Sequence, residues 1–235
     1  MTGYLTIPEL FEQTLERSAD KTWLYFEDSA YTYGDAQDRI VAIGSALADL
    51  GVGRETRIVA TAGNSPEYLL GWLAVVRLGA TFVPVNPKST SGELAGLIGQ
   101  VEPPVVITDE DLRATVDAAL GEVNSKAQVV LAGDLFKAPS VDAPPPAARE
   151  GDVAVMIPTS GTTGRSKLVM QTQRAYAMAG EGFPWWMGLN EDDILMTSLP
   201  LFHINAPAYS TLGSIAAGAG LVVLPRFSAS TFIDS

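Results

Sequence analysis

The stretch RIVATAGNSPEYLLGWLAVVRLGATFVPV, residues 57–85, contains in one run the elements that decide the fold. It opens with a short β-branched segment, Arg57–Thr61, which is typical of a strand. Ser65 and Pro66 follow in the positions of a helix N-cap and first turn, and the apolar run after them stops at Gly79. A second apolar segment after this glycine predicts another strand. Strand, helix and strand in this order indicate a right-handed crossover between parallel strands.

The alternation of helices and strands continues on both sides of this stretch. Thr6 and Glu9 have the spacing of a capping box, which predicts a helix that begins at Thr6. The other elements that we expect are a hairpin of strands 22–26 and 30–33, a helix ended by Gly51, helices 91–100 and 111–120, and strands 105–108, 128–131 and 153–157. Such alternation predicts an α/β fold of layered, mainly parallel sheets flanked by helices.

Residues 138–149 have the composition of a linker, because three consecutive prolines stiffen them and their small side chains offer little to bury. A chain of 235 residues is expected to hold between one and two domains. We therefore predict a first α/β subdomain at 1–137, a Pro/Ala-rich linker at 138–150 and a second segment at 151–235.

The composition excludes several classes of protein. Hydrophobic residues make up 47% and charged residues 18% of the chain, which argues against a disordered polymer. A net charge of −12 would repel the phosphates of a nucleic acid, so DNA and RNA are not expected as partners. The chain has no cysteine, and therefore no disulfide, thiolate zinc site or cysteine nucleophile.

Two features bear on where the protein acts. The opening residues lack the positive charges and the long apolar run of a signal peptide, so we expect a cytoplasmic protein. Residues 194–225 contain no Asp, Glu, Lys or Arg and are long enough to span a bilayer. Prolines, glycines and scattered polar residues interrupt that run, however. We predict several short elements of a buried core there, and no transmembrane helix.

A loop rich in glycine and hydroxyl groups follows the strand predicted at 153–157. It offers Gly161 and Gly164, the cation of Lys167, and the hydroxyl groups of Thr159, Ser160, Thr162 and Thr163. Glycines let a ligand approach the backbone closely, and successive backbone amides in such a loop form an anion-binding nest. The combination suits a polyphosphate.

The residues of this loop also allow two other interpretations. A Walker A loop would place its second glycine at position 166 and its metal-binding hydroxyl at position 168, where this chain has Ser166 and Leu168. The loop therefore fails that pattern twice. The other interpretation is a surface hairpin without a ligand, because most loops of this composition are of that kind.

Four segments, in the same order along the chain, resemble motifs of the adenylate-forming superfamily, which includes acyl-CoA synthetases, aryl-acid ligases, luciferases and peptide-synthetase adenylation domains. The loop TSGTTGRSKLV at 159–169 is similar to its phosphate-binding signature, with Ser166 where proline is usual and Leu168 where glycine is usual. Residues 71–87, which end in Val-Pro-Val-Asn-Pro, resemble its helix-and-strand segment. The sequences Tyr-Thr-Tyr-Gly-Asp at 31–35 and Leu-Pro-Leu-Phe-His at 199–203 are similar to two further motifs.

The resemblance implies the reaction of an AMP-forming ligase. In such enzymes a small carboxylic acid attacks ATP to give an acyl-adenylate and pyrophosphate, and a thiol of coenzyme A or of a carrier protein's phosphopantetheine then takes the acyl group. With Mg²⁺ assisting, the β- and γ-phosphates would be held by Thr159, Ser160, Gly161, Thr162, Thr163, Gly164 and Lys167. No residue of the chain is expected as a metal ligand. An acyl carrier protein is the alternative partner to coenzyme A.

His203 is the chain's one histidine. Taken alone, a single histidine in an apolar run is more often a packed structural residue. By the resemblance, it lies beside the reacting carboxylate, at the position where domains that activate amino acids carry an aspartate for the substrate ammonium. An acyl or aryl acid is therefore expected rather than an amino acid, and His203 and Lys167 are the candidate catalytic residues.

Two further clusters allow more than one interpretation. An acyl channel could be lined by the cluster of Phe183, Trp185, Trp186 and Met187, although burial in the core or at a subdomain contact is the more usual role of such residues. The adjacent Asp192 and Asp193 are expected to form a solvated turn before a strand. They do not suggest a metal site, because no further carboxylate follows at ligand spacing.

Members of the superfamily continue with segments that this sequence does not contain: one that contacts adenine, an aspartate for the ribose, a hinge, and a C-terminal domain with a catalytic lysine. We therefore interpret the chain as the front fragment of a carboxylic acid–CoA ligase, in which 151–235 holds the phosphate loop and the start of the acyl pocket. Residues 228–235 are expected to open a helix, and the chain alone is expected to be inactive. The alternatives are an enzyme that loads a carrier protein and a non-catalytic half-domain that binds a nucleotide or a partner, while an unrelated P-loop hydrolase fits least.

Overall fold

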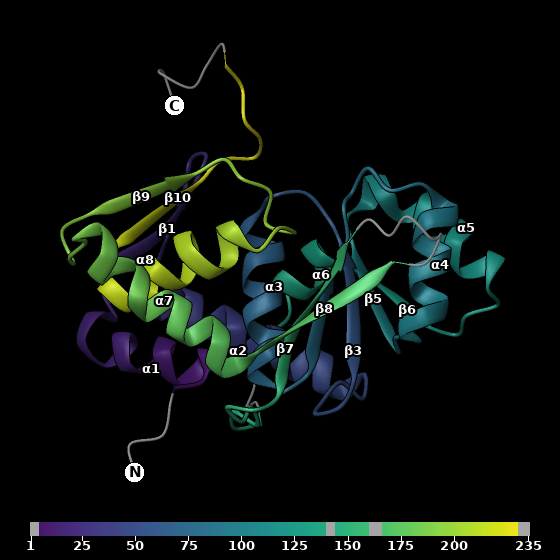
Figure 1. The fold of residues 1–235 in the computed structure, drawn as a ribbon, viewed down its shortest axis with the longest axis horizontal. Coiled ribbons are helices and arrows are strands. Elements are labelled where there is room, and N and C mark those ends of the chain that lie inside the picture. The colour runs from purple at the N-terminus through teal and green to yellow at the C-terminus, as the bar shows by residue number, and fades with distance from the viewer. Residues whose placement is uncertain (1–4, 140–143, 160–165, 230–235) are drawn as a thin grey trace.

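A computed structural model of the chain describes residues 5–139, 144–159 and 166–229. Two sheets lie side by side with helices packed around them (Figure 1). The helices are α1 Ile7–Ser18, α2 Tyr33–Asp49, α3 Pro66–Arg77, α4 Ser91–Val101, α5 Arg113–Glu122, α6 Ala132–Phe136, α7 Gln173–Met187 and α8 Leu212–Ala217, with short turns η1 Glu110–Leu112 and η2 Ala206–Thr211. The strands are β1 Thr22–Phe26, β2 Ser29–Thr32, β3 Arg57–Thr61, β4 Thr81–Pro84, β5 Val105–Thr108, β6 Gln128–Leu131, β7 Val153–Thr159, β8 Lys167–Thr172, β9 Ile194–Thr197 and β10 Gly220–Val223.

The larger sheet has six strands in the order β6-β5-β3-β4-β7-β8. All neighbours in it are parallel except β7 and β8, which form an antiparallel hairpin. Helices α4 and α5 cover one face, where Val59 packs, and α2, α3 and α6 cover the other, where Ile58 and Ala60 pack. This alternation along β3 is what a strand buried on both faces requires. The expected α/β fold with mainly parallel sheets is confirmed.

The smaller sheet has four strands in the order β2-β1-β10-β9. Strands β1, β10 and β9 are parallel, and β2 is antiparallel to β1. Helices α1, α7 and α8 pack beside it (Figure 1). Trp23 of β1 is completely buried, stacks on Tyr33 at 5.5 Å between ring centroids, and donates its indole N–H to Ser214 Oγ at 3.0 Å. The core of the smaller sheet is therefore closed by α8.

Both sheets combine segments from distant parts of the chain. The N-terminal hairpin of β1 and β2 pairs with β10, near the other end of the sequence, and the β7–β8 hairpin extends a sheet that β3–β6 build. Segments on both sides of the predicted linker at 138–150 thus contribute to each sheet. The division into 1–137 and 151–235 stays a prediction.

Most of the predicted elements are confirmed. The capping box at Thr6 is present, with Thr6 N–H donating to Glu9 Oε2 at 2.7 Å and Glu9 N–H donating to Thr6 Oγ1 at 3.3 Å. Two boundaries are wrong by a few residues. Tyr33 begins α2 instead of ending a strand, because Thr32 caps that helix, and the helix predicted at 111–120 begins at Arg113 after the turn η1.

The uncharged run 194–225 divides, as expected, into short elements: β9, η2, α8 and β10. Within the described residues, none of the helices combines the length and apolarity needed to cross a membrane. Residues 228 and 229 are not helical, and the rest of the helix predicted at 228–235 lies outside the described residues.

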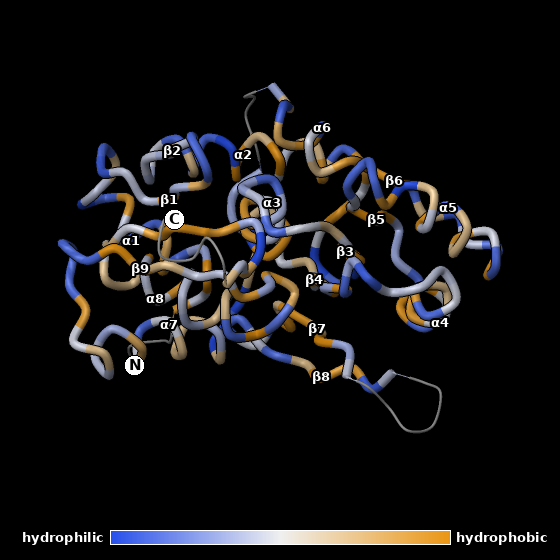
Figure 2. The backbone as a smooth tube through the Cα atoms, turned by 90° about the horizontal axis from the view of Figure 1, so that it is seen from above, coloured by the Kyte–Doolittle hydropathy of each residue, from blue (hydrophilic) through white to orange (hydrophobic). Residues whose placement is uncertain are grey.

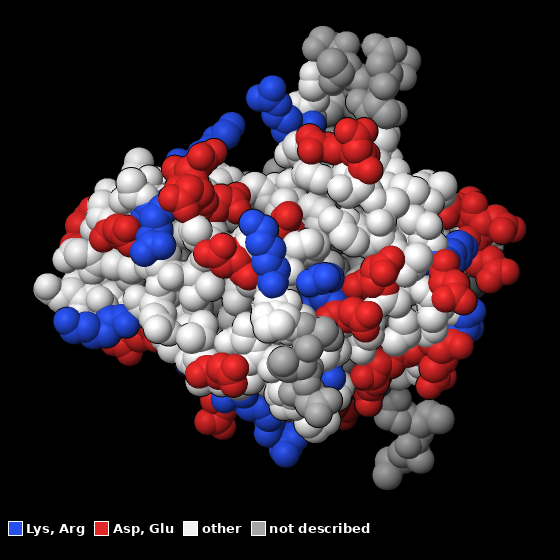
Figure 3. Space-filling model, turned by 180° about the vertical axis from the view of Figure 1, so that it is seen from behind, with Lys and Arg blue, Asp and Glu red and all other residues white. Residues whose placement is uncertain are grey.

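Hydropathy follows this architecture. Figure 2 shows hydrophobic residues along β7 and β8 of the larger sheet. Every residue of α3 except Glu67 is buried, which explains why its sequence is apolar on all sides and has no polar face. Acidic side chains spread over the face in Figure 3, in keeping with the net charge of −12. The sheets and α3 thus form the core, and the acidic residues are at the surface.

Candidate functional site

The two strands around the predicted phosphate loop are antiparallel neighbours. Thr159, the last residue of β7, lies opposite Lys167, the first residue of β8, and the Thr159 hydroxyl donates to the Lys167 carbonyl oxygen at 3.2 Å. Both side chains are exposed. The predicted phosphate-binding residues between them lie outside the described residues, and their roles stay predictions: Ser160, Gly161, Thr162, Thr163 and Gly164.

An open cavity of about 360 Å³ lies beside this hairpin. It is lined by the residues that end β4 and β7, by Ser166, by the start of α4, and by two residues of the loop after β9: Pro84, Val85, Asn86, Ser89, Glu93, Leu97, Ile157, Pro158, Thr159, Ser166, Phe202 and His203. The structure therefore brings two predicted site residues, Thr159 and His203, to one cavity. Lys167 does not line it in the described part of the chain.

His203 lies in the loop between β9 and η2. Its backbone N–H donates to the Pro200 carbonyl at 3.0 Å, which closes a turn, and its ring lies 4.5 Å from that of Phe202. Leu201 is buried beneath the turn, whereas the side chain of His203 is exposed. The alternative of a packed core histidine is therefore wrong, and the imidazole is accessible to a ligand.

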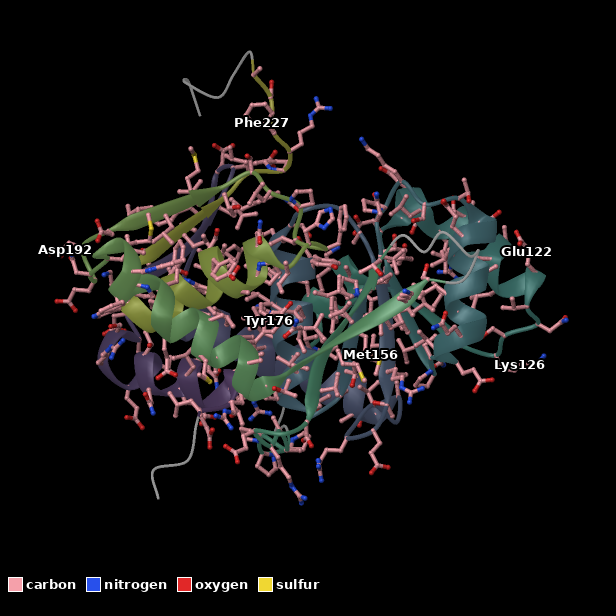
Figure 4. The ribbon with its side chains drawn as sticks, in the orientation of Figure 1. Glu122, Lys126, Met156, Tyr176, Asp192 and Phe227 are labelled. Atoms are coloured by element: carbon pink, nitrogen blue, oxygen red, sulfur yellow. The ribbon has the colours of Figure 1, made fainter. Side chains whose placement is uncertain are left out.

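A narrow apolar pocket adjoins the cavity. It shares Pro84, Ile157, Phe202 and His203 with it, and its deeper wall consists of Trp72, Phe82, Val155, Tyr176, Leu201, Ile204 and Pro207. Figure 4 shows Tyr176 near the centre of the molecule, on α7, and burial raises the pKa of its phenol. The pocket volume is about 10 Å³, close to that of one water probe. The pocket is therefore apolar and nearly closed.

Polar residues that sequence reasoning did not single out also line the cavity. Glu93 accepts hydrogen bonds at Oε2 from the Thr90 backbone N–H at 2.8 Å and from the Thr90 hydroxyl at 3.0 Å, and these bonds lower its pKa. Asn86 accepts a hydrogen bond from the Lys88 N–H at 2.9 Å. Asn86 had a sequence signal, since it lies two residues after the end of β4, a strand next to β7 in the sheet.

The aromatic cluster at the end of α7 lies elsewhere. Trp185 is 85% exposed and Trp186 is 77% exposed, so the burial expected for them is wrong, and neither lines the cavity or the pocket. Only Phe183 is half-buried, with its ring 5.6 Å from that of Tyr209. The close packing of α7 on α8 is at Gly180, and the two tryptophans lie in the last turn of α7 beyond that contact.

The predicted turn at Asp192 and Asp193 is confirmed. Asp193 Oδ2 accepts from the Asn190 N–H at 2.8 Å, and the Asp192 N–H donates to Asn190 Oδ1 at 2.9 Å, just before β9. Figure 4 shows Asp192 at the edge of the molecule. Among the residues described by the structure, no cluster of three or more His, Asp and Glu residues is arranged to hold a metal ion.

The fold belongs to the class of α/β proteins that place a ligand at the carboxyl ends of parallel strands. A sequence model of the family described as AMP-binding enzyme matches residues 11–234, so the chain belongs to this family. The crotonobetaine/carnitine–CoA ligase of Salmonella paratyphi A is 25% identical over 252 residues, which cover 99% of this chain and 49% of that enzyme.

Two solved structures share the fold. ATP-bound MatB from Rhodopseudomonas palustris superposes with a TM-score of 0.85 at 24% identity, over 98% of this chain and 47% of that one. The O-succinylbenzoate coenzyme A synthetase MenE from Bacillus subtilis, in complex with AMP, gives a TM-score of 0.85 at 23% identity, over 96% of this chain and 58% of that one. The chain spans about half the length of the curated relatives it matches.

Proposed function

We propose that this chain is the N-terminal part of an AMP-forming ligase that activates an acyl or aryl acid with ATP and transfers the acyl group to coenzyme A. The observation that carries the proposal is the cavity that joins Thr159, where the hydroxyl-rich loop begins, to His203. Membership of the AMP-binding enzyme family and the CoA-ligase names of its relatives support it. Coenzyme A is preferred over a carrier protein as acceptor because of those names.

The residues around the cavity fit the phosphates of a nucleotide. Bound ATP would supply the phosphorus that the acid's carboxylate attacks, with Mg²⁺ offsetting the phosphate charge. The hydroxyls of Thr159 and Ser166 line the hairpin side of the cavity, and the exposed Lys167 follows Ser166 as the first residue of β8. We assign the phosphates to this side. Glu93, whose lowered pKa keeps it ionised, is on the α4 side and would repel them. Ser160, Gly161, Thr162, Thr163 and Gly164 would complete this phosphate site.

The acid would bind between the phosphate site and the apolar pocket. His203 lines both the cavity and the pocket, so its imidazole can contact a carboxylate whose apolar part points toward Trp72 and Tyr176. The pocket holds little more than a water molecule, and a larger acid would need the loop that carries Phe202 to move. A small acyl or aryl acid without an ammonium group is the substrate class that this site favours.

The experiment is ATP–pyrophosphate exchange with a panel of acids, on the longer protein that contains this chain. Lys167→Ala and Thr163→Ala are each expected to lower acid-dependent exchange about 10²- to 10³-fold. The matched control is Lys126→Ala, which removes a lysine from a groove at the far end of the molecule (Figure 4). Exchange that survives both loop substitutions would refute the phosphate assignment.

Two further measurements define the activity. Thioester formation with coenzyme A and with a phosphopantetheinylated carrier protein, compared in the same preparation, tests the acceptor. The 235-residue chain alone is expected to give no exchange. Robust carboxylate-dependent exchange by this chain would contradict that expectation.

A second candidate function, a half-domain that pairs with another polypeptide segment, is favoured by an exposed apolar edge. Strand β9 is the outer strand of the smaller sheet, and Ile194 and Met196 on it are 59% and 44% exposed, close in sequence to the exposed Trp185 and Trp186. Parallel sheets usually have both faces covered, so exposed apolar side chains on such a strand are unusual. We propose that a segment corresponding to the other half of the relatives covers this edge, since the chain matches 49% of the ligase from Salmonella.

Titration with that segment tests this second function. Binding is expected to shift the fluorescence of the exposed tryptophans to shorter wavelength, and Met196→Lys is expected to weaken it. Val123→Lys, at an exposed position in the groove near Lys126, is the matched control. No complex with the wild-type chain, or equal binding by the Met196→Lys variant, would contradict the assignment.

A further inference from the structure

Asn64 lies in the turn between β3 and α3, at the carboxyl end of a central strand of the larger sheet. Its side-chain Nδ2 donates to the carbonyl oxygens of Leu199 and Leu224, both at 3.0 Å, and its Oδ1 accepts from the Leu201 N–H at 2.8 Å. Two carbonyl partners for the nitrogen and an N–H partner for the oxygen leave one consistent orientation of the amide. Three of its four hydrogen-bonding positions are used.

These contacts connect the two sheets. Leu199 and Leu201 follow β9 and Leu224 follows β10, two neighbouring strands of the smaller sheet, whereas Asn64 follows β3 of the larger one. All three partners are backbone atoms, so the contact depends on the path of the chain and not on which side chains the loop carries. One side chain therefore ties the loop after β9 to the larger sheet.

The turn that holds Asn64 is itself anchored on both sides. The Gly63 N–H donates to Asp109 Oδ2 at 2.8 Å, at the end of β5, and the Ser65 hydroxyl caps α3 by accepting from the Tyr68 N–H at 3.1 Å. Asn64 is half-buried between these two anchors. The backbone of Asn64 is therefore held in place, and its side-chain amide binds the loop after β9 from a fixed position.

We propose that Asn64 is a positioning residue that places His203 at the cavity. Leu201 is two residues from His203, and the turn from Pro200 to His203 closes through a backbone hydrogen bond of 3.0 Å. Holding the Leu199 carbonyl and the Leu201 N–H thus fixes the backbone that leads directly into Phe202 and His203, which line the cavity. The importance of this placement for catalysis rests on the function proposed above, but the placement itself does not.

An amide is the side chain that the site requires. Aspartate has the same size and could still accept from the Leu201 N–H, but it would face the carbonyl oxygens of Leu199 and Leu224 with a negative charge and no proton to donate. Alanine would remove all three hydrogen bonds. Both changes are expected to release the loop while the strands on either side remain paired.

The single histidine of the chain makes the test direct, because its ring gives one set of NMR signals in the 235-residue protein. In Asn64→Ala and Asn64→Asp, the His203 ring signals are expected to move toward those of the urea-unfolded chain. Asn190→Ala, which removes another amide that accepts a backbone hydrogen bond in a turn, is the matched control and should leave them in place. Far-UV circular dichroism and the urea midpoint report separately whether each variant is folded.

Amide hydrogen exchange in the wild-type chain is a second test that needs no variant. The Leu201 N–H is expected to be protected, and in Asn64→Ala its protection should fall about tenfold while that of β3 is kept. Unchanged His203 signals in a folded Asn64→Ala variant would overturn the proposal, and so would an unprotected Leu201 amide in the wild type. A failure of the ligase assignment would instead appear in the exchange assay and leave these signals unaffected.

Discussion

Gln173, the first residue of α7, ties the strand after the phosphate loop to two helices from the N-terminal half of the chain. Its side chain is completely buried, with Oε1 accepting from the Ile7 N–H at 3.1 Å and Nε2 donating to the Val76 carbonyl at 2.9 Å. Gln173→Met keeps the length of the side chain but leaves the Ile7 N–H without a partner and removes one hydrogen bond to the Val76 carbonyl, which also accepts from the Gly79 N–H at 3.1 Å. An orphaned buried group costs about 1–3 kcal/mol, and the apolar burial that methionine gains offsets part of the loss. We expect the free energy of unfolding to fall by about 1–3 kcal/mol.

Gln173→Glu tests the same contact by its charge. The glutamate can accept from the Ile7 N–H, but when ionised it would face the Val76 carbonyl in a buried position, which raises its pKa. A raised folded-state pKa means that stability is lost as the pH rises through that value. The variant should therefore be closer to the wild type at about pH 5 than at about pH 8, because the protonated acid can donate to the Val76 carbonyl.

Urea unfolding, followed by tryptophan fluorescence and circular dichroism, measures both variants. Gln128→Met is the matched control, since Gln128 is exposed at the start of β6, and it should change the free energy of unfolding by less than about 0.5 kcal/mol. A Gln173→Met protein within about 0.5 kcal/mol of the wild type would show that the two hydrogen bonds are not held in solution, which would refute the reasoning.

Packing and charge elsewhere allow three more predictions, each measured by urea unfolding. Gly180→Ala would place its Cβ 2.6 Å from a side-chain atom of α8 and 3.1 Å from backbone atoms of α8, and should lower the free energy of unfolding by about 1–3 kcal/mol. Gly182→Ala in the same helix meets open space and should raise the free energy of unfolding by up to about 1 kcal/mol. Burial raises the pKa of Asp109, so the folded protein loses stability as the pH rises and this carboxyl ionises. The free energy of unfolding of Asp109→Asn, compared with that of the wild type, should therefore be higher at about pH 7 than at about pH 3.5. The side-chain hydrogen bonds from Arg54 lower the pKa of Asp152 below its ordinary 3.8. The stability that the ionised Asp152 gives to the fold is therefore lost as the pH falls through that lowered value. Asp152→Asn should lower the free energy of unfolding by at most about 1 kcal/mol at about pH 7 and change it little at acid pH.

The positions of helices and strands could be predicted because their signals are local. The hydroxyl of Thr6 and the carboxylate of Glu9 lie three residues apart and form the box that the spacing indicates, and Gly79 ends α3 with a φ of +72°, in the left-handed region. The partners of each strand could not be predicted in this way. Strand β1 pairs with β10 because the side chains of the two strands are buried together, and no residue within β1 identifies its partner.

The candidate site shows the same limit. The resemblance of the sequence to a known loop and a known histidine motif identified Thr159 and His203, and the structure brings both to one cavity. Asn64 was missed because its contacts are to backbone atoms more than a hundred residues away, and such contacts leave no spacing in the sequence. Burial of Trp185 and Trp186 was expected because large aromatic side chains are usually buried. Both are exposed because they lie beyond the contact of α7 with α8, and that position could not be deduced from the residue type.

The residues that line the cavity come from both sheets. The geometry of the site therefore depends on residues that hold the two sheets together without lining the cavity. Thr159 ends a strand of the larger sheet, whereas His203 follows the outer strand of the smaller one, so a shift of one sheet against the other changes the distance between them. Asn64 resists such a shift at the carboxyl ends of the parallel strands, through its hydrogen bond to the Leu224 carbonyl. Gln173 resists it just after the last residue of β8, through its hydrogen bond to the Val76 carbonyl. Because the two ties share no partner, their effects on stability should add, and only loss of Asn64 should displace His203. If Gln173→Met moved the His203 signals as strongly as Asn64→Ala does, each sheet would move as a rigid body against the other, and the effect of Asn64 on the cavity would not be local.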